Sequence, residues 1–158
     1  VDRAALAAVV DLPQVQRLDT AFDGEHCLEV QLPFLQVLLT GFRIVPLLVG
    51  SAHGSEVAEV LERLWGGPET LIVISSDLSH YLDYATARAT DRRTAEAICA
   101  LRAQAIDTYG ACGRHPIAGL LEQARHHHLQ ATLLDLRNSG DTAGPRDRVV
   151  GYGAYSFA

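Results

Sequence analysis

The sequence predicts an α/β fold with a mixed, mostly parallel sheet flanked by helices, in a single unit that spans residues 1–158. Continuous apolar runs, in place of alternating ones, indicate strands that are covered on both faces. An amphipathic helical pattern separates two of these runs, as in the strand, helix, strand unit of a parallel sheet. No internal repeat or flexible linker divides the chain, and 158 residues with 48% hydrophobic content can bury a core.

Two helices are expected near the N-terminus. Residues 3–10 have a helical composition, and this helix should end by Leu12, because a residue that precedes a proline is disfavoured in the helical conformation. Apolar side chains at helical spacing predict a second helix over residues 25–39. Pro33 should bend or split that helix, and Gly41 should end it.

The central part of the chain predicts the strand, helix, strand unit. Residues 42–49 form a continuous apolar run with one proline, and residues 70–75 form a shorter run rich in β-branched side chains. Between them, residues 55–65 are amphipathic, and Ser55 is a candidate N-cap for the helix that they form. We therefore expect two buried strands joined by a crossover helix.

The last part of the chain predicts two longer helices and a pair of strands. The helices are expected over residues 84–101 and 116–128, and Pro116 suits the first position of the second one. Residues 131–136 and 149–157 have the pattern of strands. The polar, glycine-containing loop between them favours an antiparallel pair.

The charge balance excludes two classes of partner. The formal net charge is −6 and no basic run occurs, whereas nucleic acids and anionic membranes are bound mainly through Lys and Arg.

No apolar stretch approaches the roughly 20 residues that span a bilayer, and the N-terminus lacks the pattern of a signal peptide. Three widely spaced cysteines are poor material for a disulfide framework. We expect a cytoplasmic protein that binds neither nucleic acid nor membrane.

Polar side chains follow directly after the expected strand at residues 70–75. Ligands of open α/β sheets bind beyond the carboxyl ends of the strands, and Asp77 and His80 lie there, three residues apart. One helical turn would place both on the same side, so that the carboxylate could fix the tautomer of an imidazole that acts as general acid or base. We predict that Asp77 and His80 are catalytic, whereas helix capping is the better interpretation for Ser76 and Ser79.

A second candidate site is the cysteine-containing loop before the last expected helix. Gly110 and Gly113 flank Cys112 and permit close approach of the backbone. The helix that begins near Pro116 points its positive end at this loop, which suits a metal ligand or a nucleophile. His115 follows the cysteine at a spacing that permits shared metal binding but signals it only weakly. The structural alternative is a small buried cysteine.

The remaining ligand-type residues are better explained by structure. Glu25 is expected in the first turn of a helix because of the helix dipole, and Cys27 and Cys99 have the pattern of core residues. The three histidines from His126 to His128 fall in the last turn of a helix, where cationic side chains are favourable. Because three adjacent residues cannot share one face, we interpret them as a solvated helix end rather than a metal site.

Several motifs, taken together and in order along the chain, resemble the Memo family, also called AmmeMemoRadiSam system protein B. They are EHCLEVQLPFLQ at 25–36, VPLLVG at 45–50, SSDLSHY at 75–81, ACGRHPI at 111–117, and NSGDTAG followed by RVVGYGA at 138–154. The resemblance implies an α/β fold related to the class III extradiol dioxygenases, which use non-haem iron. It also implies a metal site near the carboxyl edge of the sheet.

Residue by residue, the resemblance implies Cys112 as a metal ligand, where the dioxygenases carry a carboxylate. It implies Asp77 and His80 beside the site, with His80 in the place of the dioxygenases' acid–base histidine. The other two family ligands are histidines in motifs resembling PHAGY and GPSHH, and neither motif occurs in this sequence. We therefore expect the C-terminal half of a Memo-like domain, with an incomplete site for a transition metal, iron or copper in preference to zinc.

Three functions are compatible with these residues. The first is a metal-dependent redox protein of unknown substrate, whose site is completed by the N-terminal half. The second is a non-catalytic binding module that docks a protein partner from a radical-SAM system, because one fold can serve several functions. The third, a hydrolase in which His80 activates Ser76 or Ser79, is disfavoured because the G-x-S-x-G nucleophile elbow is absent.

Overall fold

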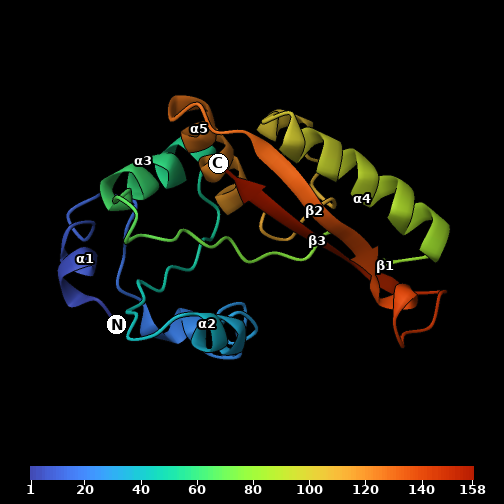
Figure 1. Ribbon diagram of the computed structural model, residues 1–158, viewed down its shortest axis with the longest axis horizontal. Helices are drawn as coiled ribbons and strands as arrows, with labels where there is room; N and C mark the ends of the chain where they lie inside the picture. Colours follow the sequence, from blue (N-terminus) through green and yellow to red (C-terminus); the bar gives the residue numbers. More distant parts are fainter.

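The computed structural model describes residues 1–158, and Figure 1 shows helices packed beside a long, twisted hairpin. The helices and strands, in chain order, are α1 (Arg3–Ala7), α2 (Leu32–Leu38), α3 (Gly54–Leu64), β1 (His80–Leu82), α4 (Tyr84–Cys99), α5 (Arg114–His126), β2 (Ala131–Asn138) and β3 (Val149–Phe157). Short 3-10 helices stand at Asp19–Phe22, Ala103–Ala105 and Ser139–Asp141. The predicted mixture of helices and strands is confirmed.

The sheet has three strands in the order β1-β3-β2, and both pairs are antiparallel. The hairpin of β2 and β3 pairs Ala131 with Phe157 at one end and Asn138 with Gly151 at the other. The predicted antiparallel pair at the C-terminus is therefore confirmed. The prediction of a mostly parallel sheet is not confirmed, because the sheet contains no parallel pair.

The strands expected at residues 42–49 and 70–75 lie outside the sheet. Both segments are coil, and they cross the molecule between α2 and the packed helices (Figure 1). Most residues of 42–49 are half-buried, as the apolar composition predicts. A strand also needs a hydrogen-bonded neighbour, and the long-range backbone bond of 42–49 is a single one, from the Asp2 N–H to the Ile44 carbonyl at 2.8 Å. An apolar run thus predicts burial without supplying a partner strand.

Helices α3 and α5 pack closely and run parallel, because their contacts advance together along both. Gly119 of α5 faces Val57 of α3 so closely that a Cβ on the glycine would overlap the valine side chain. One turn further on, the Gln123 side chain donates to the Ala58 carbonyl at 2.7 Å. The buried core of this pair consists of Val57, Leu61 and Leu120. Both helices begin and end within two residues of the predicted bounds.

Helix α4 lies along the hairpin and covers one side of it (Figure 1). Asp83 caps its first turn by accepting the N–H groups of Ala85 and Thr86, each at 3.1 Å. The predicted helix over residues 84–101 is confirmed, two residues shorter at its C-terminal end. The main core joins α4, α5 and the adjoining loops, and its buried members are Leu78, Ile98, Ala111, Ile117 and Leu121.

The two N-terminal helices are shorter than predicted. Helix α1 ends at Ala7, and α2 begins at Leu32 with Pro33 in its first turn. The proline therefore starts a helix rather than bending one, since its missing N–H has no partner to lose in a first turn. Exposed apolar side chains on α2 are Phe34, Val37 and Leu38. Helix α2 thus presents an apolar face to solvent.

Candidate functional site

The candidate catalytic segment, residues 76–80, is held on strand β3. The Leu78 N–H donates to the Gly151 carbonyl at 2.9 Å, and the Gly151 N–H donates to the Ser79 carbonyl at 2.8 Å. Position 151 requires a glycine, because any Cβ there would overlap the Asp91 carboxylate that packs against it. Backbone pairing with β3, and not a helix, therefore positions this segment.

A β-bulge interrupts β1 directly after the candidate segment. His80 pairs with Val150 and Leu82 with Val149, so Tyr81 is the extra residue. Tyr81 has a left-handed backbone with φ of 59°, which is uncommon for a residue with a side chain. Bulges often redirect side chains beside functional sites, and here His80 and Tyr81 are both exposed.

Asp77 and His80 lie side by side on this segment. The Asp77 Oδ2 atom is 3.2 Å from His80 Nε2, and the two side chains are 47% and 39% exposed. The predicted helical turn between them does not form, and neither Ser76 nor Ser79 caps a helix. The contact orients the imidazole with its Nε2 edge toward the carboxylate, which leaves Nδ1 for another partner.

Cys112 lies against the backbone of Asp77. Its sulfur accepts the Asp77 N–H at 3.2 Å, and its own N–H donates to the Asp77 carbonyl, also at 3.2 Å. Ser76 Oγ accepts the Gly113 N–H at 2.8 Å and ties the loop to the candidate segment. A Cβ at Gly113 would lie 2.7 Å from Ser76 Cβ, so this approach requires the glycine. The Cys112 side chain itself stays exposed.

The structure thus brings Cys112, Asp77 and His80 into one region, with Asp77 touching both of the others. It does not assemble them into a compact metal-binding group. The group of three ligand-type side chains whose ligand atoms all lie within 4.8 Å of one another is found elsewhere in the chain. Metal binding by Cys112 and catalysis by Asp77 and His80 stay predictions.

Asp91 of α4 belongs to the same region and was missed by the sequence analysis. Its Oδ1 accepts the Ser79 N–H at 3.0 Å, and the residue is 2% exposed. Burial raises the pKa of the Asp91 carboxyl, and the Ser79 N–H opposes that rise. Through Ser79, this carboxylate positions the segment that carries His80. The available signal was a charged residue at helical spacing between the buried Ala87 and Ala95.

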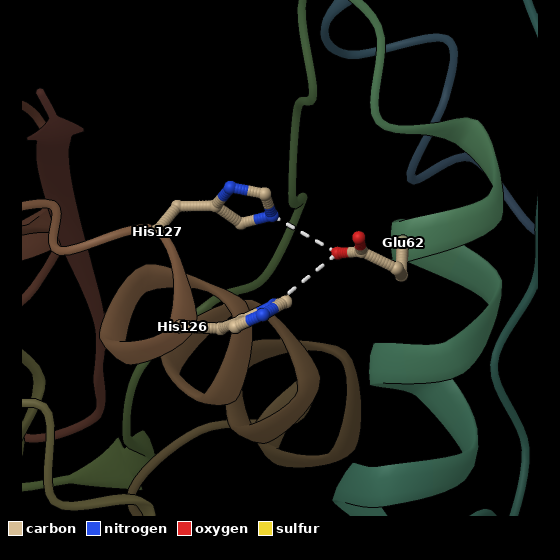
Figure 2. Close-up of side chains that lie close together, drawn as sticks. All are labelled: Glu62, His126 and His127. Atoms are coloured by element: carbon tan, nitrogen blue, oxygen red, sulfur yellow. Dashed lines mark hydrogen bonds and ion pairs between the residues drawn. The ribbon is translucent and has the colours of Figure 1, made fainter.

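Glu62, His126 and His127 form a second cluster, which Figure 2 shows. Glu62 lies in the last turn of α3, His126 ends α5, and His127 follows it. The Glu62 Oε2 atom is 2.9 Å from His127 Nε2 and 3.5 Å from His126 Nδ1. The helix end is solvated as predicted, since His126 and His128 are exposed, but His126 and His127 also come within reach of one carboxylate. Two adjacent histidines reach one carboxylate because one uses Nδ1 and the other Nε2.

The electrostatics of this second cluster keep its carboxylate ionised. The hydrogen bond from His127 is the largest cause that lowers the pKa of the Glu62 carboxyl, and nearby His126 lowers it further. Two imidazole nitrogens and a carboxylate oxygen are a donor set that divalent transition metals accept. No local pattern indicates this cluster, because Glu62 and the histidines are brought together by the packing of α3 on α5.

Residues with expected structural roles lie outside both regions. Glu25 does not begin a helix, but its carboxylate accepts the N–H groups of His26 and Cys27 at 2.8 and 2.9 Å. These bonds lower the pKa of Glu25, whereas burial raises the pKa of the Cys27 thiol. Cys99 is half-buried and lines, together with Asp91, a cavity of about 440 Å³ between α4 and β2.

Comparison with known proteins identifies the family of this chain. The profile of the Memo-like protein family matches residues 1–156. The chain belongs to the Memo-like protein family. A MEMO1 family protein of Methanosarcina acetivorans is 36% identical to it over 145 residues, which cover 82% of this chain and 54% of the relative.

Two further relatives of the Memo-like chain support the assignment. A MEMO1 family protein of Aeropyrum pernix is 38% identical over 144 residues, which cover 82% of this chain and 50% of the relative. Another, from Thermoplasma acidophilum, is 31% identical over an alignment of 162 positions, which covers 96% of this chain and 59% of the relative. The resemblance predicted from the sequence motifs is therefore confirmed.

The Memo-like chain spans between about half and three fifths of the length of these relatives. None of its helices has the length and apolar character that crossing a bilayer requires.

Proposed function

We propose that this Memo-like chain contributes the thiolate side of a transition-metal redox site. In this proposal Cys112 is a metal ligand, and Asp77 and His80 are the acid–base pair beside it. The observation that carries the proposal is the contact between the Cys112 sulfur and the Asp77 N–H, which sets the thiol next to the pair. Iron or copper is the preferred metal, in line with the resemblance of the family to the extradiol dioxygenases.

The donors fit such a metal in kind but not in number. Iron and copper both accept sulfur and imidazole ligands. The Cys112 sulfur, Asp77 and His80 do not make a group of three converging ligands. The remaining ligands are therefore expected from residues outside this sequence, which agrees with the match to about half of each relative.

Each side chain of the region has a separate role in the proposal. A bound metal supplies redox chemistry at the thiolate. His80 takes or delivers a proton at Nδ1, because its Nε2 edge faces Asp77. Asp77 holds the orientation of the ring, and Asp91 is a positioning residue that acts through the Ser79 backbone. The bulge at Tyr81 keeps the imidazole exposed, where a substrate can reach it.

The same proposal includes a fold of the extradiol dioxygenase type. We infer that residues 42–49 and 70–75 become strands of a mostly parallel sheet when the rest of the domain is present. Their apolar composition and their lack of a strand partner support this inference. The exposed side chains of Leu71 and Val73, at 65% and 44%, would be covered by the same packing.

A chimeric protein tests the metal-binding role. The N-terminal half of the Methanosarcina acetivorans relative is joined to this chain, and iron content, copper content and dioxygen uptake are measured. We expect one iron or copper ion bound at the Cys112 region of each chimera, and loss of most of this ion in the Cys112→Ser variant. Cys99→Ser is the matched control, because Cys99 lies at the end of α4 and has no hydrogen bond to Asp77, His80 or Cys112. Full metal content and uptake in Cys112→Ser would contradict the proposal.

A second pair of variants separates catalysis from metal binding. His80→Gln should keep the metal of the chimera but lower the rate by about 10²–10⁴-fold, the usual contribution of a positioned acid or base. Asp91→Asn should change the rate less, because Asn can still accept the Ser79 N–H. A His80→Gln chimera that takes up dioxygen at the unaltered rate would remove His80 from the mechanism.

The exposed apolar face of α2 favours a second candidate function, a binding module for a protein partner such as one from a radical-SAM system. Phe34 and Val37 are 70% and 85% exposed, and faces of this kind commonly mark interaction sites. Partner recovery in a pull-down should then depend on Phe34→Ser and Val37→Ser. It should not depend on the triple variant Asp77→Ala, His80→Ala, Cys112→Ala. Equal recovery from the Phe34 and Val37 variants would exclude this role.

A further inference from the structure

The cluster of Glu62, His126 and His127 lies at the adjacent C-terminal ends of two parallel helices. Gly119 allows the close approach of α3 and α5, and the bond from Gln123 to the Ala58 carbonyl keeps them in register. The negative ends of both helix dipoles therefore meet at the same place, and they favour a bound cation. The Glu62 carboxylate adds a full negative charge there.

The way in which α5 ends directs the histidines toward α3. The Leu129 N–H donates to the Ala124 carbonyl at 2.8 Å, and the His128 N–H donates to the Arg125 carbonyl at 3.3 Å, the pattern of a Schellman motif. His128 takes the left-handed position with φ of 57°. The chain turns away at this residue, and the ring of His127 points at α3 (Figure 2).

Trp65, the residue after α3, fixes the ring of His127. The two rings are stacked, with centroids 4.2 Å apart and an angle of 2° between their planes. The stack leaves the Nε2 edge of His127 facing Glu62 Oε2 at 2.9 Å. A ring that is already ordered loses little conformational entropy when it binds a ligand, so the site is partly preorganised.

We propose that Glu62, His126 and His127 bind a divalent transition metal, with Zn²⁺ as the best-fitting ion. The three ligand atoms lie within 4.8 Å of one another. In tetrahedral zinc sites with bonds of about 2.0–2.2 Å, neighbouring ligand atoms are separated by about 3.4 Å. The separations of 2.9 and 3.5 Å from Glu62 Oε2 are near this value. The pair of imidazole nitrogens, which lie within 4.8 Å, has to close by about 1.4 Å at most. Two imidazoles and one carboxylate leave the fourth position for water.

This metal site is independent of the Cys112 region. Its ligands come from α3 and the end of α5, and none of them contacts Asp77, His80 or Cys112. A metal held there would join two helix ends that already share the contact between Glu62 and His127. Because the site exists only in the folded chain, binding also stabilises the fold by mass action.

Metal titration of the full chain tests the proposal. Zn²⁺ binding is measured by calorimetry in wild type and in the Glu62→Gln and His127→Gln variants. We expect one Zn²⁺ per wild-type chain and an affinity at least about tenfold lower in each variant, since loss of a supporting group alone costs that much in metal sites. Urea unfolding of each variant, without metal, establishes that the fold is retained.

Co²⁺ provides a spectroscopic readout of the ligand atoms. Bound Co²⁺ should give the visible absorption of a tetrahedral nitrogen and oxygen site, without the charge-transfer band of a sulfur ligand. It should also quench the fluorescence of Trp65, the one tryptophan of the chain, which stacks directly on a ligand ring. A sulfur band would place the ion at a cysteine and overturn the assignment.

Two variants serve as matched controls. His128→Asn tolerates the left-handed backbone and changes a neighbouring histidine outside the cluster, so the Zn²⁺ affinity should stay at the wild-type value. Cys112→Ser should likewise leave it unchanged, even if the redox proposal for Cys112 is correct. Absence of stoichiometric binding, unaltered affinity in the Glu62→Gln and His127→Gln variants, or loss of binding in Cys112→Ser would each overturn the proposal.

Discussion

The part of the chain before Gly54 and the part from Gly54 onward have similar apolar patterns but very different packing. Of the 26 buried residues, only Val9 and Leu12 precede Gly54. The later part buries the faces of three helices against one another and against the hairpin, whereas Phe34 stays 70% exposed on α2. Apolar residues become a core only where a second apolar surface is in reach.

This difference matters for function because both candidate regions lie in the well-packed part. The Cys112 region rests on backbone bonds to Asp77 and on the pairing of Gly151 with the candidate segment. The Glu62 cluster rests on the α3 and α5 pair. Substitutions that weaken this packing should therefore disturb site geometry, and substitutions on α2 should not.

The largest expected loss of stability is that of the Leu121→Ala variant. Leu121 is fully buried in the main core, and truncation of such a leucine destabilises a domain by about 2–5 kcal/mol, through lost transfer energy and the cavity left behind. Urea unfolding monitored by circular dichroism measures the loss. Val37→Ala on α2 should stay within about 0.5 kcal/mol of wild type, because Val37 is 85% exposed. Equal losses in the two variants would contradict the comparison.

A smaller loss is expected for Gly119→Ala, which adds one methyl group between α3 and α5. The new Cβ would overlap Val57, and overpacking of this kind costs about 1–3 kcal/mol. It should also separate the helix ends and lower the Zn²⁺ affinity of the Glu62 cluster. The control is Gly50→Ala, where a Cβ meets no atom within 4 Å and stability should be unchanged. Wild-type stability and affinity in Gly119→Ala would show that the helices adjust freely.

The well-packed part also contains buried polar atoms that have no hydrogen-bond partner. The Tyr155 hydroxyl is buried without a hydrogen-bond partner, and burial raises its pKa to about 12. Tyr155→Phe removes this unsatisfied group and should raise the free energy of unfolding by about 1 kcal/mol. Tyr109→Phe, at a position that is 82% exposed, should have no effect. A loss of stability in Tyr155→Phe would reveal a partner for the hydroxyl.

The last expected effect is a change of pH dependence rather than of stability at one pH. Burial raises the pKa of Asp91 above its unfolded value of 3.8, so its protonated form favours folding. This contribution is complete below the unfolded pKa and is lost as pH rises through the folded pKa. Relative to Asp91→Asn, wild type should therefore lose stability across that acidic window, as measured by urea unfolding at several pH values. Parallel curves would mean that Asp91 titrates normally.

Local sequence patterns predicted the helices and strands whose formation depends mainly on neighbouring residues. The bounds of α4 were predicted to within two residues, and the β2 and β3 hairpin followed from strand pattern and turn chemistry. The proximity of Cys112 to the segment of Asp77 and His80 was implied by the family resemblance, and spacing alone did not establish it. These features depend on sequence neighbours or on motifs that the chain displays directly.

What the sequence analysis missed depends on contacts between distant residues. The parallel sheet was predicted from apolar runs, but residues 42–49 and 70–75 find no neighbouring strand in the chain. Glu62 meets His127 only because Gly119 lets two helices approach, and no local pattern encodes that meeting. Asp91 is hidden in an alanine-rich helix face, where its partner is the backbone N–H of Ser79.

Apart from the Thr70 N–H, which donates to the Gly67 carbonyl at 3.0 Å, the backbone N–H groups of the coil segments 42–49 and 70–75 have no carbonyl partner in the fold. They should exchange with deuterated water early, while those of the long hairpin are retained. Such open rows of donors and acceptors are also templates for adding a strand from another molecule. The concentration at which this chain is handled will therefore decide whether it stays monodisperse or self-associates through these rows.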